Sequence, residues 1–326
     1  RRYLWEFSEE ECWNTFRFRK EHMPELVNAL QVPENGIVLG NRGRFDRETA
    51  MLFLLYRFRY GSRLDDVTTA VGGGYSMASR VVSSMVIHIS DKFGSVLADG
   101  IGAWRNELDV FAECIRAKTG ALPGSVTGSI CGFVDGGLRP LCRPSDPNLQ
   151  LATFSGHKRV NGMKFQSVQI PSGIMADMWG PVAGRRHDQH LMNRSNLNTR
   201  LAAIQLGRPA AEQRCVYGDK AYAVMSHVKS GFSGANLTSQ QQNFHRVLNS
   251  VRICVEWGFG NVQSLWGFCD VKKNLKLHLQ PVARIYQVAV LLMNCHTCLY
   301  GSQTGKYFDC HAPELREYFA LHGHAY

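Results

Sequence analysis

The spacing of apolar residues changes at about residue 126, and no other feature of this sequence limits its fold as much. Before this point apolar residues recur at helical spacing, and after it they form short runs separated by turn residues. A series of strands followed by strands that alternate with helices predicts a mixed α/β sheet. We therefore expect an all-helical N-terminal domain over residues 1–120, an α/β domain over residues 121–300 and a C-terminal tail over residues 301–326.

The first 118 residues predict several helices. Ser8 followed by Glu11 is typical of a capped helix start. The other expected helices are Pro24–Leu30, the strongly apolar Arg47–Tyr60, Leu64–Val71 and Ser76–Phe93. The glycine turn between the last two gives a helix-turn-helix outline over about residues 64–93. Its second helix carries few cations among many apolar residues, which favours packing over reading of DNA.

The rest of the chain predicts five strands and three helices. The expected strands are Ser129–Asp135, Leu149–Phe154, Met163–Ile170, Gly173–Trp179 and Cys215–Asp219. The expected helices are Asp188–Leu206, Asn243–Trp266 and Pro281–Leu299.

The net charge of +10 lies entirely in the second part of the chain. Residues 1–120 hold 16 basic and 16 acidic side chains, whereas residues 121–326 hold 21 and 11. A basic domain poor in acids indicates a polyanionic partner such as nucleic acid. A basic surface that serves only solubility is the alternative, and charge alone does not decide between them.

Other classes of protein fit the composition poorly. No run of 18 apolar residues occurs, so we expect no membrane-spanning segment. The ten cysteines are scattered through apolar segments, which favours reduced thiols in the core over a disulfide framework. Cys295 and Cys298 have the spacing of metal ligands, but a single pair favours cysteines that pack on a helix over a zinc site. A start at Arg1 without Met is compatible with a fragment of a longer protein.

Two aspartates follow apolar strands and stand beside glycine. Asp135 follows Ile-Cys-Gly-Phe-Val and precedes Gly136, and Asp219 follows Cys-Val-Tyr-Gly. If these two strands are neighbours, both carboxylates come within reach of one metal ion. Glycine also permits close packing, so each motif alone is weak evidence.

Glu256 strengthens this hypothesis. Apolar residues at helical spacing across Phe244–Trp266 predict an amphipathic helix, and Glu256 lies at the edge of its apolar face. Arg252 stands four residues earlier and could pair with Glu256 as a structural partner. The alternative is that the helix delivers a third metal ligand. Two aspartates and one glutamate suit a pair of Mg²⁺ ions, which prefer oxygen ligands and act on both the attacking and leaving oxygens of a phosphodiester.

Six ordered motifs give the chain a resemblance to a known family. They are Gly132–Gly136, Ser155–Arg159, Lys164–Gln166, Gly180–Asp188, Tyr217–Tyr222 and Val251–Gly260. Over about residues 125–300 the sequence resembles the PIF/Harbinger transposases and their domesticated nuclease relatives. The resemblance implies a ribonuclease-H-like catalytic core with a DDE triad of Asp135, Asp219 and Glu256. Gly137 stands where the family more often has a hydroxyl residue.

Several basic residues are candidates for binding the DNA backbone. They are His157, Lys158, Arg159, Arg185, Arg186, Lys220, Lys272, Lys273 and Lys276. For the lysine cluster a solvated basic face is the alternative. Asp188 directly precedes a predicted helix, which favours a helix cap over a metal ligand.

The resemblance implies a transposase that cleaves double-stranded DNA at transposon ends and joins the freed 3′-hydroxyl to target DNA. It implies Mg²⁺, with Mn²⁺ as a substitute, a homo-oligomer, a Myb-like DNA-binding partner and a place in the nucleus. One alternative is a domesticated DNA- or chromatin-binding protein that keeps the fold without cleavage. Another is an RNA-cleaving enzyme on the same fold.

Overall fold

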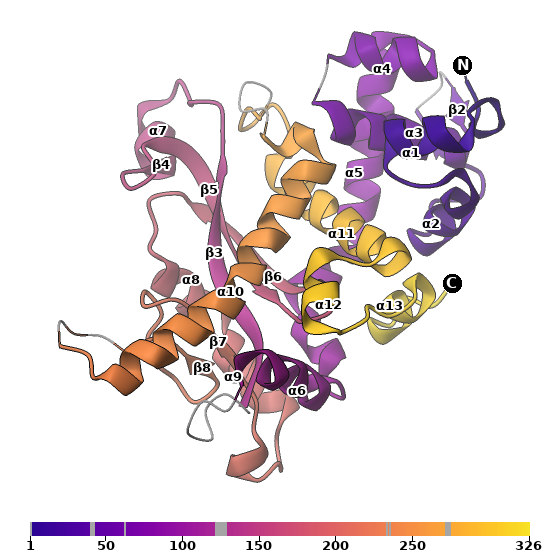
Figure 1. The fold of residues 1–326 in the computed structure, drawn as a ribbon. Helices are drawn as coiled ribbons and strands as arrows, with labels where there is room; N and C mark the ends of the chain where they lie inside the picture. Colours follow the sequence, from indigo (N-terminus) through magenta and orange to yellow (C-terminus); the bar gives the residue numbers. More distant parts are fainter. Residues whose placement is uncertain are drawn as a thin grey trace. The chain divides into compact units, whose positions relative to one another are not determined.

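The computed structural model describes residues 2–39, 43–61, 63–120, 129–232, 234, 236–270 and 275–326 (Figure 1). The chain forms two compact units. Unit 1 comprises residues 1–94, 261–299 and 314–326, and unit 2 comprises residues 95–260 and 300–313. The predicted limits of functional domains at residues 120 and 300 are a different division and stay a prediction.

Unit 1 is built mainly of helices. They are η1 (Leu4–Glu6), α1 (Glu9–Phe16), η2 (Lys20–His22), α2 (Met23–Ala29), α3 (Arg47–Tyr60), α4 (Leu64–Val71), most of α5 (Tyr75–Ala98), η7 (Gly267–Asp270), most of α11 (Val282–Tyr300) and α13 (Leu315–Leu321). The helical N-terminal region is therefore confirmed, and α3 and α4 have the predicted bounds. One pair of short antiparallel strands corrects the expectation that it is helical throughout. These are β1 (Ile37–Val38) and β2 (Arg44–Phe45), and they form because Ile37 and Phe45 pair across the ribbon and are both buried.

Local signals explain how these helices begin and pack. The Ser8 hydroxyl accepts a hydrogen bond from the Glu11 amide, and the Glu11 carboxylate accepts one from the Ser8 amide, as the capping pattern predicts. In α5 most apolar positions are buried, Tyr75 and Ile87 being exposed, and His88 lies 3.1 Å from the Leu30 carbonyl oxygen. This favours the packing interpretation of the helix-turn-helix outline.

Two helices are long and apolar enough to cross a membrane by length and composition alone, α5 and α11. The most apolar window of α11 is 67% buried inside the protein. Core helices pass the same test, so this is weak evidence for a membrane segment.

Unit 2 contains a mixed sheet. Its strands are β3 (Ile130–Pro140), β4 (Phe154–Ser155), β5 (Val160–Gln169), β6 (Met175–Ala183), β7 (Cys215–Tyr217) and β8 (Val228–Lys229). The order is β4-β5-β3-β7-β8, and β6 also pairs with β5. The strands β3, β5 and β6 form an antiparallel meander, whereas β7 runs parallel to β3 and β8 parallel to β7. This mixed sheet is that of a ribonuclease-H-like core.

One predicted strand is wrong. Residues 147–153 form helix α7 (Pro147–Thr153) where a strand was expected over Leu149–Phe154, and only Phe154 and Ser155 are extended. The side chain of Asp146 accepts a hydrogen bond of 2.7 Å from the Leu149 amide. An N-terminal aspartate cap and a proline in the first turn start a helix, and these signals outweigh the apolar run.

The other helices of unit 2 flank the sheet. They are η4 (Gly100–Trp104), α6 (Leu108–Thr119), α8 (Asp188–Ser195), α9 (Leu197–Ile204), η6 (Ala210–Glu212), residues 239–260 of α10 (Ser239–Leu265) and α12 (Gln303–Phe308). The single helix expected over residues 188–206 is split, because Asn196 adopts a left-handed conformation with a φ of 53°. Asparagine tolerates this conformation better than most residues. The segment expected as a tail contains α12 and α13.

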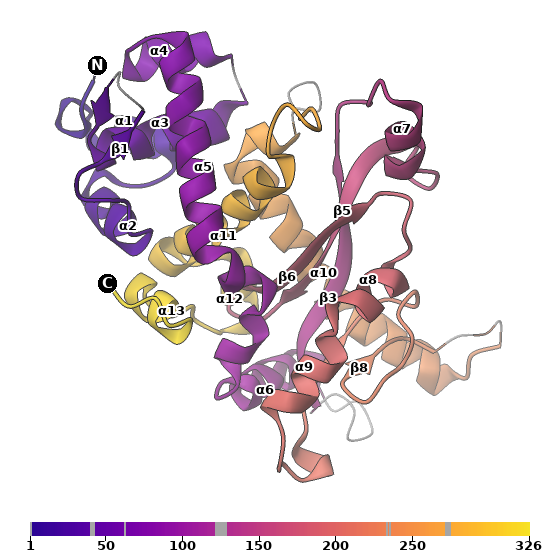
Figure 2. The same ribbon diagram turned by 180° about the vertical axis from the view of Figure 1, so that it is seen from behind.

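The two faces of the sheet carry different helices. Figure 1 shows α10 crossing in front of β3, and Figure 2 shows α8 and α9 on the opposite face. The glycines of β3 agree with this arrangement, because successive residues of a strand point to opposite faces. A Cβ atom built on Gly137 would meet Phe259 of α10 at 2.8 Å, and one built on Gly136 would meet Asp188 of α8 at 2.4 Å.

Candidate active site

Asp135 and Asp219 come from neighbouring parallel strands. In the β3–β7 pair Phe133 lies opposite Tyr217, so each aspartate follows its strand's last paired residue by two positions. The sequence predicted that the strand ends at Asp135. This prediction is wrong, because β3 continues to Pro140. That continuation pairs with β5 alone, and Asp135 lies opposite Ser167 there. The ladder to β7 ends before both carboxylates, which leaves them at one edge.

Asp135 is held in a fixed position. Its Oδ1 accepts a hydrogen bond of 2.8 Å from the Gly136 amide, and its Oδ2 accepts one of 3.1 Å from Nη1 of Arg252. Burial raises the pKa of the Asp135 carboxyl, and the negative charge of Asp219 adds to this. The Arg252 guanidinium acts in the opposite direction on that pKa. The carboxylate therefore needs a nearby positive charge.

Asp219 opens onto a pocket of about 450 Å³. Its Oδ1 accepts a hydrogen bond of 2.8 Å from the amide of Ala221, which fixes the turn after β7. The pocket is lined by Tyr217, Asp219, Lys220, Gly231, His245, Asn249, Arg252, Ile253 and Glu256. Of the three proposed metal ligands, two therefore face the same hollow.

Glu256 lies on α10, as predicted, and its side chain is 60% exposed. Nη2 of Arg252 lies 3.7 Å from its Oε1. The expected pairing of Arg252 with Glu256 is therefore present. The same guanidinium also binds Asp135, so Arg252 joins the strand carboxylate to the helix carboxylate.

The hydroxyl of Tyr222 lies close to the acidic residues. Tyr222 is buried, and its hydroxyl has no hydrogen-bond partner among the residues that the structure describes. Burial raises its pKa well above the ordinary value, and the charges of Asp135, Asp188 and Asp219 raise it further. A buried hydroxyl without a partner is costly, so a water molecule or ligand in this region would satisfy it.

The donor set fits magnesium. Asp135, Asp219 and Glu256 offer only carboxylate oxygens, which hard divalent cations prefer. In the described part of the chain, no three side chains of His, Cys, Asp or Glu converge on one position. Instead, the guanidinium of Arg252 contacts both Asp135 and Glu256.

Asp188 plays a different part from the one expected. It is the first residue of α8 and does not cap the helix, since His187 holds the cap position. Its Oδ1 accepts a hydrogen bond of 3.0 Å from Nζ of Lys164, and it lies beneath Gly136 on the α8 face of the sheet. The α10 face carries the contact between Asp135 and Arg252. Asp188 thus packs against β3 on the face of the sheet opposite to α10.

Five of the proposed DNA-binding residues lie at one end of the sheet. His157, Lys158 and Arg159 are exposed in the turn between β4 and β5, and Arg185 and Arg186 are exposed in the turn after β6. The two turns are neighbours, because the amide of Gly184 donates to the carbonyl oxygen of Gly162. Ser167, the partner of Asp135, lies five positions along β5 from Gly162, which corresponds to about 17 Å.

The remaining basic candidates are distributed more widely. Lys220 is exposed and lines the pocket beside Asp219. Lys276 is exposed and belongs to unit 1. Lys272 and Lys273 lie outside the described residues.

Other features serve the structure. Asp177 of β6 is buried and forms an ion pair with Arg200 of α9. Cys295 is buried in α11, and burial raises the pKa of both Cys295 and Cys298, which favours their thiol form.

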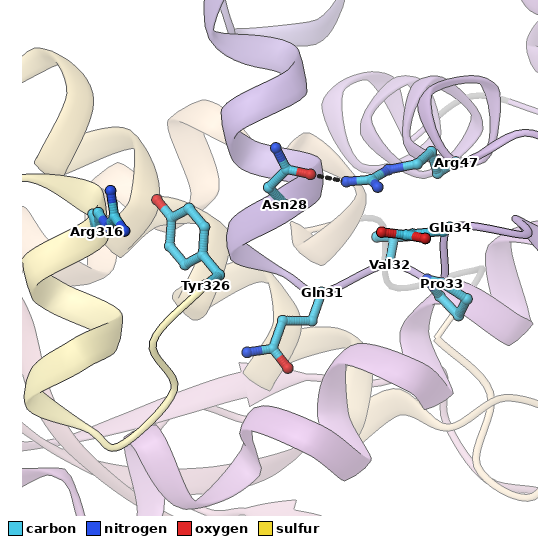
Figure 3. A pocket seen from close by; sticks show the side chains of 8 residues that line it. All are labelled: Asn28, Gln31, Val32, Pro33, Glu34, Arg47, Arg316 and Tyr326. Carbon is cyan, nitrogen blue, oxygen red and sulfur yellow. Dashed lines mark hydrogen bonds between the residues drawn. The ribbon is translucent and has the colours of Figure 1, made fainter.

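A further pocket of about 560 Å³ belongs to unit 1 and is shown in Figure 3. Arg47 donates a hydrogen bond to Asn28 at its edge. Arg316 and Tyr326 also line it, together with Glu34, its one carboxylate. It therefore lacks the paired acids of the pocket in unit 2.

Sequence reasoning missed two contacts. The pairing of Arg252 with Asp135 joins residues 117 positions apart, and that of Lys164 with Asp188 crosses from a strand to a helix. Helical spacing could indicate only the contact between Arg252 and Glu256. The orphan hydroxyl of Tyr222 also follows from packing and leaves no local signal.

Comparison with known proteins gives one match. Residues 134–294 match the family model described as DDE superfamily endonuclease. The matched segment contains Asp135, Asp219 and Glu256. Among curated proteins and among solved structures, nothing matches the chain.

Proposed function

Because residues 134–294 make this chain a member of the DDE superfamily endonuclease family, we propose that it is a metal-dependent DNA endonuclease of the Harbinger transposase type. Its reaction is hydrolysis of phosphodiester bonds at transposon ends. The freed 3′-hydroxyl then attacks target DNA by the same in-line displacement.

One observation carries this proposal. Asp135 and Asp219 each stand two residues past the last pair of the parallel β3–β7 ladder. Arg252 of α10 contacts both Asp135 and Glu256, so Glu256 lies in the same region. Burial raises the pKa of Asp135, so a second negative charge close by is unfavourable without a cation. Arg252 supplies one such positive charge in the metal-free protein, and a bound divalent cation would supply more.

The carboxylates of Asp135, Asp219 and Glu256 are the proposed ligands of two Mg²⁺ ions, for which Mn²⁺ substitutes. Bound there, such ions supply Lewis acidity at the attacking and leaving oxygens of the phosphodiester. Both aspartate side chains are held in place, since the carboxylate of Asp135 accepts a hydrogen bond from the Gly136 amide and that of Asp219 accepts one from the Ala221 amide. Glu256 is exposed and has the longer side chain, so it can adjust its reach from α10.

The basic residues are the proposed contacts of the DNA backbone. The two basic turns lie beyond Gly162, which is itself about 17 Å along β5 from the partner of Asp135, so they would contact duplex about five base pairs or more from the cut. Lys220 stands beside Asp219 and is placed to bind a phosphate next to the one that is cut. From the resemblance to Harbinger transposases, the proposed assembly is a homo-oligomer that acts in the nucleus with a Myb-like partner. Residues 1–120 carry no net positive charge, so recognition of a DNA sequence is assigned to that partner.

Nicking of supercoiled plasmid DNA tests the endonuclease activity. The full chain should convert plasmid to the nicked form with Mg²⁺ or Mn²⁺ and not with EDTA. Asp135→Asn, Asp219→Asn and Glu256→Gln should each lower the rate by orders of magnitude, because each removes a charged ligand and keeps the shape. Asp188→Asn is the matched control, since Asp188 pairs with Lys164 on the other face of β3. Near-normal nicking by any of the three amide variants would remove that residue from the triad.

Retention of DNA binding separates this proposal from its rival. The amide variants should bind DNA without metal at least as tightly as the original chain, since repulsion between carboxylate and phosphate is relieved. A chain that binds DNA and shows no metal-dependent nicking under any condition would instead be a DNA-binding relative that has kept the fold.

A further inference from the structure

A second pocket adjoins the candidate active site in unit 2. It has a volume of about 640 Å³, within the range of pockets that hold small organic groups. Lys220 and Gly231 line both this pocket and the one that contains Asp219 and Glu256. The two pockets are therefore adjacent.

One side of this pocket is aromatic. Phe232 is 43% exposed, and its ring meets that of Phe244 at 5.2 Å in an edge-to-face arrangement. The Phe244 ring in turn meets Tyr217 of β7 at 6.2 Å. Val224 lines the pocket too and is 65% exposed. Apolar side chains left open to water in a hollow indicate a binding surface.

Two lysines also line this pocket. Lys220 is exposed and Lys229 is half-buried at the end of β8. Neither forms a salt bridge with another described residue. Nζ of Lys229 approaches only the carbonyl oxygen of Met225, at 3.5 Å. Both positive charges are thus available to an anionic ligand.

We propose that this pocket, called here the aromatic pocket, binds an unpaired base of the DNA strand that is cut. The inference rests on the proposed function and names the form of its substrate. Every base has a face that stacks on aromatic rings, and the phosphates on either side of it suit Lys220 and Lys229. In paired duplex that face is covered by neighbouring bases, so the base must leave the stack to enter.

The position of Lys220 connects the two pockets. Since it lines both, one phosphate bound by Lys220 can join a base in the aromatic pocket to the phosphate at Asp219. An apolar protein segment could also cover Phe232 and Val224, but it would leave both lysines without a partner. The charges therefore favour a nucleotide.

The test uses the full chain in EDTA and a 12-nucleotide oligothymidylate with one central 2-aminopurine. The original chain should bind it and quench the 2-aminopurine fluorescence, and should not quench it when the strand is fully paired. Phe232→Ala should weaken binding of the single strand by about tenfold and remove the quenching, because one stacking contact is lost. Phe232→Tyr should keep both, because it retains the ring.

A second variant guards against a folding defect. Val224→Glu adds a negative charge at an exposed position and should weaken binding by a similar factor, with an unchanged melting temperature. Leu206→Ala is the control, since Leu206 is 91% exposed and lines neither pocket. Equal single-strand binding by all these variants would overturn the aromatic pocket as a base site, and that result is also what a protein-docking surface would give.

Plasmid nicking by the original chain separates this inference from the proposed function. Nicking with Mg²⁺ but no quenching would overturn the base site and leave the endonuclease in place. Quenching that depends on Phe232 without any nicking would support the base site and overturn the endonuclease.

Discussion

Replacement of Arg252 by methionine removes the one cation that joins the candidate metal ligands. Nη1 of Arg252 binds Asp135 at 3.1 Å, and both side chains are about one-fifth exposed. A hydrogen bond to a charged, partly buried group contributes about 1.5–3 kcal/mol. The contact with Glu256 is longer and that carboxylate is 60% exposed, so it adds about 0.3 kcal/mol. Arg252→Met should therefore cost the metal-free protein about 2 kcal/mol.

The same change should strengthen metal binding. In the original chain, a cation must displace the guanidinium from Oδ2 of Asp135, whereas in Arg252→Met that oxygen is free. If about 2 kcal/mol no longer opposes binding, Mg²⁺ should bind up to about 30-fold more tightly. Titration calorimetry without DNA measures this affinity, and it does not depend on activity.

Thermal unfolding with and without Mg²⁺ completes the assay. Without metal, the melting temperature of Arg252→Met should be about 4–8 °C below that of the original chain. Saturating Mg²⁺ should raise the melting temperature of Arg252→Met by more than it raises that of the original chain. The double variant with Asp135→Asn should recover much of the lost stability, because it leaves no unpaired carboxylate on β3. Equal Mg²⁺ affinity in the original chain and Arg252→Met would refute the idea that this guanidinium takes the place of the metal.

Three further predictions follow from other parts of the chain. If the basic turns bind phosphates, Arg185→Gln with Arg186→Gln should reduce the slope of log K against log salt by about 1.8, measured by fluorescence anisotropy, and an unchanged slope would return both residues to a solvated surface. Residues 1–120 alone should bind DNA weakly and without sequence selectivity, which a nanomolar specific complex at physiological salt would contradict. Burial lowers the pKa of His296 to about 4, so between pH 6.5 and 4 the unfolded chain takes up a proton that the folded chain lacks. The free energy of unfolding should therefore fall on acidification, by about 2 kcal/mol from this group at pH 5. In urea titrations His296→Phe should lessen that fall, and an identical pH dependence in the two chains would mean that His296 is not the group responsible.

Local sequence signals account for much of the fold. The capping pair at Ser8, the continuous apolar run of α3 and the helical spacing around Glu256 each lead directly to the structure. Asp135 and Asp219 could also be found, because apolar strands that precede them turn out to be neighbours. These features depend on residues close together in the sequence or on simple alternation.

What could not be predicted depends on contacts between distant segments. The strand was expected to end at Asp135, but β5 pairs with β3 as far as Pro140. Arg252 could be placed beside Glu256 by helical spacing, whereas its contact with Asp135 requires the packing of α10 on the sheet. The helix at residues 147–153 had local signals in Asp146 and Pro147, and the apolar run outweighed them wrongly.

The absence of a side chain at Gly137 allows α10 to pack closely against β3. Phe259, three residues beyond Glu256 on α10, would come within 2.8 Å of any Cβ atom at this position. The close packing on β3 of α10, the helix that carries Glu256, thus depends on a residue without a side chain. Even a small hydroxyl side chain at this position would require α10 to shift or Phe259 to turn. A survey of acidic residues alone would therefore overlook a position that limits how α10 packs beside the candidate site.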